Sequence, residues 1–241
     1  MGNAYPFIDL NADVGEGGEQ DAVLFASGIT SANVACGGHA GDDATMAAAC
    51  ALAARHGVSL GAHPGYADRV NFGRQKHSLD LAELGVLLAD QVRALQVHAR
   101  RADLPIRHVK PHGALYHFLN VQAEHALLFA ASVKALAPGA AIFGPPSGSL
   151  REACEVAGVL FVAEGFMDRG YLANGTLLPR NEPGAILHEA EAVVRQSLEL
   201  ARSGRIETLC VHGDSEDSVR WLIAVRAALL AAGFRVSSRL A

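Results

Sequence analysis

Short apolar runs alternate with longer amphipathic or alanine-rich stretches along the whole chain. Apolar runs bounded by Gly, Pro or polar residues are typical of buried strands, whereas apolar residues at helical spacing are typical of helices that cover a core. Strands are predicted to begin at Phe7 and to cover 30–35, 58–62, 106–109, 141–143, 159–163 and 208–211, with a short edge strand at 234–237. Helices are predicted over 20–26, 44–56, 80–101, 121–136, 149–156, 187–202 and 216–232.

Residues at the ends of these segments support the assignment of helices. Asp42 stands just before the alanine-rich helix 44–56, where its carboxylate can accept hydrogen bonds from the N–H groups of the first turn. Gly57 follows that helix, and glycine is common where a helix ends. The helix 80–101 carries Leu84, Leu88 and Leu95 on one face.

The strand-then-helix unit repeats about seven times without a long linker, a break in composition or an internal repeat. Units of this kind build a parallel sheet, and seven or eight of them can close into a barrel. The chain is therefore predicted to be an α/β protein in which residues 1–241 form a single TIM-barrel-like (β/α) domain of about seven parallel strands.

Polar residues of unusual type follow the predicted strands at their carboxyl ends. They are Asn11, Asp13, His39, Asp42, His63, Lys110, His112, Glu164, His212 and Asp214. In a parallel barrel these ends meet on one face, where enzymes of this architecture place their active sites. The sequence therefore predicts a catalytic site at the carboxyl end of the barrel.

The first strand carries the densest group of acidic residues. Asp9, Asn11 and Asp13 alternate, so they point the same way if the strand continues, and Glu16 follows a glycine. Carboxylates so close together repel one another unless a cation, a proton or a basic side chain lies among them. A solvated acidic loop remains the alternative explanation.

The histidines fall into groups by position. His39, His63, His112 and His212 follow strands next to Gly or Pro and are candidates for one shared site. Those in or beside helices, His56, His98, His125 and His188, are predicted to be surface residues, and no role is assigned to His77, His108 and His117.

Basic residues are mostly arginines, since the chain has only three lysines, Lys76, Lys110 and Lys134. Lys110 follows a buried strand, where it can pair with a carboxylate or hold a phosphate or carboxylate ligand. Two long loops are predicted, at 65–78 and 165–184, and they contain four arginines: Arg69, Arg74, Arg169 and Arg180. They are either solvated loop charges or a grip for planar anions.

Charge and composition exclude some classes of function. A net charge of −5 argues against nucleic-acid or membrane-surface binding. No signal-peptide pattern and no apolar run of about 18 residues is recognised, so a cytoplasmic location is expected. The four cysteines show no paired spacing and are predicted to be buried free thiols.

Common nucleotide and hydrolase motifs are missing from the sequence. There is no Walker pattern, no Rossmann GxGxxG after a strand and no G-x-S-x-G elbow. The glycine cluster at 36–42 precedes a helix and offers backbone amides to an anion, which is weak evidence alone.

The motifs together resemble the lactam-utilisation (LamB/YcsF) family. The resemblance is carried by DLNADVGE at 9–16, NVACGGHAGD at 33–42, GAHPGYADR at 61–69, FGR at 72–74, VKPHGALY at 109–116, EGFMDRGY at 164–171, LPR and PGA around Arg180 and Gly184, and CVHGD at 210–214. The chain departs from the family pattern at Gly65, Gln75 and His117, which lie in loops over the expected site.

This resemblance implies a barrel similar to that of polysaccharide deacetylases and a role as the A component of a 5-oxoprolinase. The implied reaction is the ATP-dependent opening of the lactam 5-oxo-L-proline to L-glutamate, with release of ADP and phosphate. ATP with Mg²⁺ is the implied cofactor, and subunits B and C are the implied partners.

Such a reaction needs a base, a proton donor and a grip for phosphate. Asp13 and Glu16 are expected to be a base or magnesium ligands, and His63 and His112 to transfer protons or, with Asp13, to bind a divalent metal. Lys110 is placed with them as a catalytic residue. Substrate and phosphate contacts are expected from Asn11, His39, Asp42, Arg69, Arg74, Glu164, Asp168, Arg169, Arg180, His212 and Asp214.

Two alternatives use the same residues. One is a divalent-metal amidohydrolase or deacetylase that needs no ATP, with Asp13, His63 and His112 as metal ligands. The other is a non-catalytic subunit that binds substrate or supports its partners.

Overall fold

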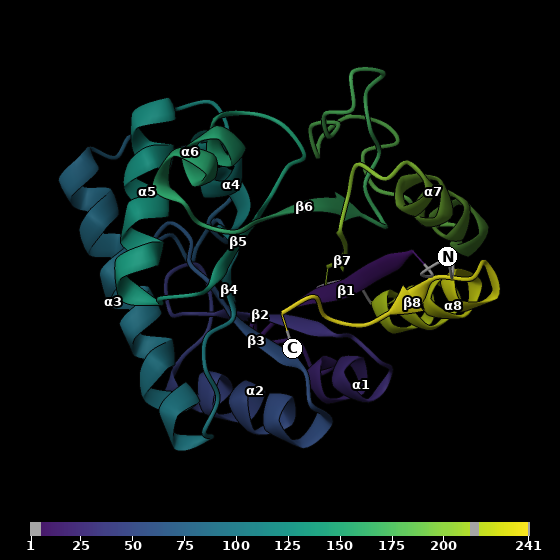
Figure 1. Cartoon of the computed structure of the whole chain (residues 1–241), viewed down its shortest axis with the longest axis horizontal. Helices are drawn as coiled ribbons and strands as arrows, with labels where there is room; N and C mark the ends of the chain where they lie inside the picture. The colour runs from purple at the N-terminus through teal and green to yellow at the C-terminus, as the bar shows by residue number, and fades with distance from the viewer. Residues whose placement is uncertain (1–5, 213–216, 241) are drawn as a thin grey trace, which may run out of the picture.

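The computed structural model describes residues 6–212 and 217–240, in which helices surround a ring of parallel strands (Figure 1). The strands are β1 (Phe7–Val14), β2 (Ser31–Ala35), β3 (Ser59–His63), β4 (His108–Val109), β5 (Ala141–Gly144), β6 (Phe161–Phe166), β7 (Thr208–Val211) and β8 (Arg235–Val236). The helices are α1 (Asp21–Ala26), α2 (Asp43–His56), α3 (Leu81–Arg101), α4 (Gly113–Leu119), α5 (Ala123–Leu136), α6 (Ser149–Ala157), α7 (Ala190–Arg202) and α8 (Ser218–Ala231).

The sheet closes because β1 pairs with both β2 and β7. The strand order is β2-β3-β4-β5-β6-β7-β1, and every pairing in this ring is parallel. Strand β8 pairs only with the start of β1, at Phe7 and Ile8, and adds an edge outside the ring. The predicted barrel of about seven strands and its extra edge strand are therefore confirmed.

Side chains of β1 alternate between two environments. Ile8, Leu10, Ala12 and Val14 are buried in the apolar core that the strands share with the helices. Asp9, Asn11 and Asp13 point into the barrel, because they bond to side chains of Thr208, Glu164 and Lys110, which lie on or just after other strands of the ring. The sequence-based expectation that these polar residues share one side is confirmed.

Hydrogen bonds fill the lower part of the barrel interior. The carboxylate of Asp9 accepts from the hydroxyls of Thr30 at 2.6 Å, Ser31 at 2.7 Å and Thr208. Burial outweighs these bonds and raises the pKa of Asp9 above its usual value. Above it, the Asn11 amide donates to Glu164 at 3.1 Å. This polar plug forms the floor on which the candidate site lies.

Helix ends follow the local rules of capping. Asp42 caps α2 through the N–H of Thr45, and Gly57 ends α2 with left-handed backbone, as predicted. Asp80 and Glu83 form a reciprocal capping box at the start of α3. Of the described helices, none is long and apolar enough to cross a membrane.

Two local predictions need correction. No helix was predicted over 113–119, but the buried Ala114, Leu115, Tyr116 and Leu119 give α4 an apolar face against the core. Strand β6 continues to Phe166, so Glu164 lies within the strand instead of at its end.

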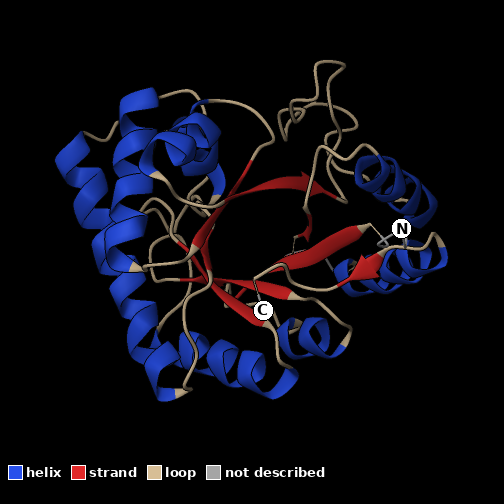
Figure 2. Ribbon diagram, viewed as in Figure 1, coloured by secondary structure: helices blue, strands red, loops and turns tan. Residues whose placement is uncertain are grey.

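The longest loop, which joins β6 to α7, is partly ordered as a lid; we use this name for residues 168–188 (Figure 2). Antiparallel bridges link Arg169 to Ile186 and Tyr171 to Leu177. The N–H of Leu187 donates to the carbonyl of Asp168 at 2.9 Å, which closes the base of the lid. The lid is thus a folded hairpin anchored to the barrel rim.

Candidate active site

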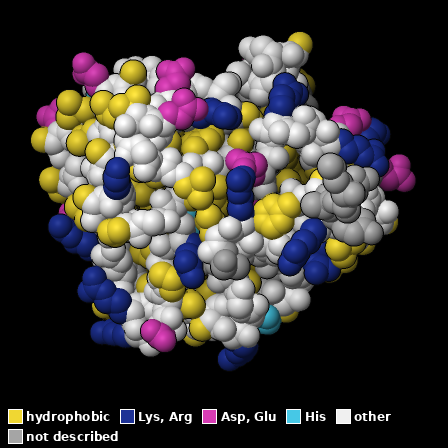
Figure 3. Space-filling view, viewed as in Figure 1, with side chains coloured by type: hydrophobic (Ala, Val, Ile, Leu, Met, Phe, Trp, Pro, Cys, Tyr) yellow, Lys and Arg dark blue, Asp and Glu magenta, His cyan; other side chains and the backbone are white. Residues whose placement is uncertain are grey.

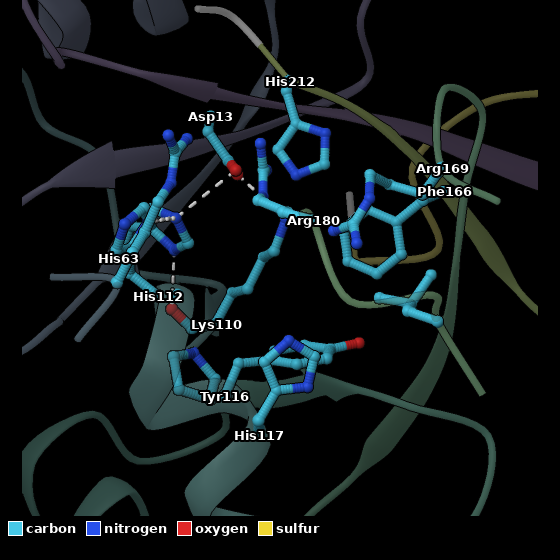
Figure 4. A pocket seen from close by; sticks show the side chains of 14 residues that line it. Asp13, His63, Lys110, His112, Tyr116, His117, Phe166, Arg169, Arg180 and His212 are labelled. Carbon is cyan, nitrogen blue, oxygen red and sulfur yellow. Dashed lines mark hydrogen bonds and ion pairs between the residues drawn. The ribbon is translucent and has the colours of Figure 1, made fainter. Parts of the chain in front are cut away.

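A small cavity opens at the carboxyl end of the barrel (Figure 4). Residues from β1, β3, β6, α4, the lid and the segments after the strands line it: Asp13, His63, Arg74, Lys110, Pro111, His112, Gly113, Tyr116, His117, Phe166, Arg169, Leu177, Arg180 and His212. Its volume is about 50 Å³. One water needs roughly 10–15 Å³ on this measure, so the cavity suits a small molecule.

Lys110 is the central charge of this cavity. Its Nζ lies 2.9 Å from Asp13 Oδ1, 3.0 Å from Glu164 Oε1 and 3.0 Å from Cys210 Sγ. Burial alone would lower the pKa of Lys110, but the surrounding acidic groups, led by Asp13, raise it well above its usual value. Lys110 is therefore a permanently charged ammonium between two buried carboxylates.

Asp13 is held ionised by its basic neighbours. Burial would raise the pKa of this carboxyl, but the charges of His63 and Lys110 outweigh it and hold the pKa well below its usual value. Its second oxygen, Oδ2, lies 3.5 Å from His63 Nε2. Asp13 thus connects the Lys110 pair to a group of histidines.

That group, which we call the His/Glu cluster, consists of Glu16, His39, His63 and His112. One possible ligand atom from each lies within 4.8 Å of those of the others. His112 Nδ1 is 3.0 Å from His63 Nε2 and 3.5 Å from Glu16 Oε1, and His39 Nε2 is 2.9 Å from Glu16 Oε1. Four electron-pair donors therefore meet at one point, where His63 and His112 line the cavity.

Backbone carbonyls decide which ring nitrogens of His63 and His112 carry hydrogen. His63 Nδ1 donates to the carbonyl of Lys110 at 2.8 Å, and His112 Nε2 donates to the carbonyl of Phe72 at 2.9 Å. In neutral rings the facing atoms, His63 Nε2 and His112 Nδ1, then both carry lone pairs. Two lone pairs at 3.0 Å repel unless a proton or a cation lies between them.

Burial keeps the imidazoles of His39 and His112 neutral. It lowers the pKa of His39 to about 2 and, with the neighbouring His63 and His39 charges, holds the pKa of His112 well below its usual value. Neutral imidazole with its other nitrogen bonded to a carbonyl is the usual form of a metal-ligating histidine. The donor set of imidazoles and one carboxylate fits a borderline ion such as Zn²⁺ better than Mg²⁺, which prefers oxygen.

A second acid–base pair lies across the cavity. His212 Nδ1 donates to both carboxylate oxygens of Asp168, at 2.8 and 3.0 Å, and its ring stacks on Phe166. Burial would raise the pKa of Asp168, but the charge and hydrogen bond of His212 outweigh it and lower the pKa. Since Asp168 holds Nδ1, the other nitrogen of His212 remains available to a ligand in the cavity.

Three of the four loop arginines line the cavity, namely Arg74, Arg169 and Arg180. The Arg169 guanidinium donates to the carbonyls of Ala185 at 2.9 Å and Leu178 at 2.6 Å, so part of its donor capacity organises the lid. Burial and the nearby Arg180 lower the pKa of Arg169 to about 10. Together these residues make the rim cationic.

Other residues expected at the site lie outside the cavity wall. Arg69 donates to the carbonyls of Gly37 and Gly41 and does not line the cavity. Asp42 is exposed at the start of α2, Asn11 lies in the polar plug, and Asp214 falls outside the described residues.

Some cavity residues were not predicted as site residues. Tyr116, Phe166 and Leu177 belong to apolar or loop segments that carry no chemical signal of their own. His117 was left unassigned, although it follows the tyrosine of the VKPHGALY motif. Tyr116 is the last residue of that motif, and this membership was the one feature of the sequence that could have marked it as a site residue.

Comparisons with known proteins agree with one another. The protein-family model described as LamB/YcsF family matches residues 8–240 of the chain. The A component of 5-oxoprolinase from Streptomyces avermitilis is 42% identical, over 96% of this chain and 99% of that protein, and that of Nocardia farcinica is 41% identical, over 96% and 98%.

Two solved structures are similar to this chain, one in sequence and fold and the other in fold alone. A lactam utilization protein from Thermus thermophilus superposes with a TM-score of 0.88 at 36% identity, covering 96% of this chain and 99% of that one. The catalytic domain of a peptidoglycan N-acetylglucosamine deacetylase from Eubacterium rectale superposes with a TM-score of 0.56 at 11% identity, covering 100% and 92%, which indicates a shared fold alone.

Proposed function

The chain belongs to the LamB/YcsF family, and from this premise we propose that it is the A component of a 5-oxoprolinase. The proposed reaction opens 5-oxo-L-proline to L-glutamate and is coupled to hydrolysis of ATP to ADP and phosphate. The names of relatives at about 40% identity over nearly their full length support this activity.

One observation carries the proposal: the ionised Asp13, with His63 and His112 of the His/Glu cluster, lines a small cavity whose rim is cationic. Lactam opening requires groups that activate the amide carbonyl and a water molecule, together with a grip for the substrate carboxylate. The activating groups and the grip for the carboxylate lie on different sides of one cavity: Figure 4 shows His63 and His112 on one side and Arg169 on the other.

Each group has a proposed role. Asp13, held ionised by Lys110 and His63, accepts a proton from the attacking water. His212, oriented by Asp168, donates a proton to the departing lactam nitrogen. Arg74 and Arg180 bind the substrate carboxylate or a phosphate oxygen. Lys110 stabilises negative charge but already bonds to three neighbours, so it is not proposed as a phosphate ligand.

The His/Glu cluster fits a divalent metal. Glu16, His39, His63 and His112 would hold it, while Asp13 lies beside them. A bound metal of this kind supplies Lewis-acid polarisation of a carbonyl or lowers the pKa of water. This set shares His63 and His112 with the set expected from the sequence, which also included Asp13, whose Oδ1 bonds to Lys110.

ATP with Mg²⁺ and the partner subunits B and C belong to the same proposal. The relatives are named as one lettered component of 5-oxoprolinase, which supports a complex with several subunits. The cavity of about 50 Å³ is too small to enclose a whole nucleotide, so any ATP contact here is expected at its phosphates. A cytoplasmic location is also proposed, and the buried free thiols of Cys36, Cys50, Cys154 and Cys210 suit a reducing compartment.

The test is glutamate release from 5-oxo-L-proline by the chain with its B and C partners, each omitted in turn, with and without ATP and Mg²⁺. Full activity is expected only with all components. Asp13→Asn should lower kcat by about 10²-fold or more, since it removes the proton acceptor. Asp90→Asn, on the exposed face of α3, is the matched control and should be neutral.

Other outcomes point to other functions. Hydrolysis of an amide without ATP by the metal-loaded chain would favour a metal-dependent amidohydrolase, which the His/Glu cluster also suits. Full activity of the assembled Asp13→Asn enzyme would argue for a non-catalytic, substrate-binding role.

A further inference from the structure

One side of the cavity is apolar. Pro111, Tyr116, Phe166 and Leu177 line it, in contrast to the histidines, Asp13 and the arginines elsewhere. In Figure 4, Tyr116 and Phe166 lie across the Lys110 side chain from His63 and His112. A ligand whose polar groups reach the cluster and the rim would therefore turn its hydrocarbon part to this wall.

Two members of the wall are fixed by the body of the barrel. Phe166 ends β6 and stacks on His212, with ring centroids 5.3 Å apart and an interplanar angle of 13°. Tyr116, on α4, meets Phe166 edge to face at 5.9 Å and is buried. Neither ring can move without disturbing the His212–Asp168 pair or the core.

Leu177 is the member of the wall that comes from the lid. It is half-buried and packs on Tyr116, Phe166 and Cys210. Its backbone is held on both sides: Leu177 bridges to Tyr171, and the N–H of Leu178 donates to the carbonyl of Gly170 at 2.9 Å. The guanidinium of Arg169 in turn binds the carbonyl of Leu178 at 2.6 Å. With the backbone fixed, the length of the Leu177 side chain sets the depth of the cavity on this side.

We propose that Leu177 is a specificity-determining residue that limits the size of the lactam ring. The inference rests on the proposed function, because it assigns the ring methylenes of 5-oxo-L-proline to the wall of Tyr116, Phe166 and Leu177. A six-membered lactam carries one more methylene, and a cavity of about 50 Å³ with a rigid wall has little space for it. One methylene in an apolar pocket changes discrimination by roughly 10- to 200-fold.

The experiment compares two substrates in the assembled enzyme with ATP and Mg²⁺. They are 5-oxo-L-proline, which yields glutamate, and its six-membered homologue 6-oxopiperidine-2-carboxylate, which takes up one water to yield 2-aminoadipate. Leu177→Ala should raise the ratio of kcat/KM for the six-membered over the five-membered lactam by about tenfold or more. Leu177→Met, which nearly conserves volume, should leave the ratio close to that of the wild type.

Leu172→Ala is the matched control, since Leu172 lies on the same lid, is exposed and does not line the cavity. It should leave the ratio unchanged. Leu177→Val provides a milder truncation if the alanine variant does not fold, and it should move the ratio in the same direction.

The outcomes separate the two proposals. If the wild-type complex opens 5-oxo-L-proline but Leu177→Ala and Leu177→Val have the wild-type ratio of kcat/KM for the two lactams, the role proposed for Leu177 is wrong and the proposed function stands. If the same shift appears in Leu172→Ala, the effect belongs to the lid in general and the role of Leu177 is again wrong. If the wild-type complex opens neither lactam, both proposals fall.

Discussion

A single ammonium group, that of Lys110, holds together two carboxylates in the barrel interior. Asp13 and Glu164 are both nearly fully buried, and their charges would repel without it. The sequence left open whether Lys110 pairs with carboxylates or grips a phosphate. Its contacts favour the ion pair, and they leave phosphate or substrate carboxylate to the arginines of the rim.

His108 allows a test of the polar interior by pH. Its Nε2 donates to Asn33 Oδ1 at 2.7 Å, and burial lowers its pKa to about 3. The unfolded chain takes up a proton at His108 near pH 6.5 but the folded chain does not, so this residue destabilises the fold progressively as pH falls from about 6.5 to about 3. His108→Gln keeps a donor but lacks this titration. The free energy of unfolding of His108→Gln minus that of wild type should therefore increase by about 2–3 kcal/mol when the pH is lowered from about 7 to about 4.5.

Urea denaturation at the two pH values measures this difference. The matched control is His56→Gln, because His56 is exposed at the end of α2, outside the barrel interior. An equal pH dependence of wild type and His108→Gln would show that His108 is not buried in its neutral form.

Two histidines show what a single sequence leaves undecided at the scale of the residue. His98 was predicted to be a surface residue because it lies on a helix, and this prediction is wrong: it is buried, and its Nε2 bonds to Asp43 on α2 at 2.9 Å. His108 was left unassigned, yet it lies fully inside the barrel. Position on an element gives no information on which neighbouring element packs against the residue.

The lid is the element whose shape decides the upper wall of the cavity. Gly170 permits a close approach of its two sides, because a Cβ there would collide with the carbonyl oxygen of Gly184. Backbone cannot yield as a side-chain tip can, so Gly170→Ala should displace the hairpin and with it Leu177 and Arg169. The expected loss is on the order of 10- to 100-fold in kcat/KM for lactam opening, with the barrel still folded.

Activity assays and limited proteolysis across 168–188 test this prediction. Gly85→Ala is the contrasting control: an added Cβ on α3 meets nothing within 4 Å, and the change should stabilise the protein by about 0.5–1 kcal/mol. Wild-type activity and protease resistance of Gly170→Ala would mean that the lid tolerates the extra methyl group and is not held as closely as its contacts indicate.

Prediction of elements from the sequence succeeded where the signal is periodic. The amphipathic pattern and Asp80 located α3, and Asp42 and Gly57 located the ends of α2. It failed for α4, whose seven residues are too few to display a clear period and whose apolar face is defined by what it packs against. It also gave no conformation for the lid, whose bridges join residues far apart in the loop.

At the scale of the whole molecule, the His/Glu cluster joins segments that are distant in sequence. Glu16 follows β1, His39 follows β2, His63 ends β3 and His112 precedes α4. Metal bound here should therefore tie these parts of the barrel together and stabilise the folded chain. Zn²⁺ at about one hundred times its Kd should raise the free energy of unfolding by about 2.7 kcal/mol, and Mg²⁺ at the same concentration should have little effect.

Thermal unfolding of the chelator-treated protein, with each metal added back, measures the effect without reference to activity. His112→Ala should abolish the stabilisation by Zn²⁺, while His125→Ala, outside the cluster on α5, should retain it. Stabilisation that persists in His112→Ala, or that Mg²⁺ produces equally, would contradict the proposed ligand set.

Charged side chains of both signs lie on the face of the molecule that Figure 3 shows. On the face seen in Figure 3, basic and acidic side chains are interspersed, without one continuous basic area. The expectation that the chain has no nucleic-acid partner rests on its net charge of −5.

The sequence by itself determined the order of strands and helices, the parallel barrel and the face on which polar residues gather. These follow from periodicity and from the shared direction of parallel strands, both of which are properties of neighbouring residues. The tertiary structure alone decided the partners: that Lys110 pairs with Asp13 and Glu164, that Glu16 and His39 join His63 and His112, and that Leu177 closes the apolar wall. Distances across a closed barrel depend on register and on side-chain packing between strands far apart in the chain, and no local pattern in the sequence specifies them.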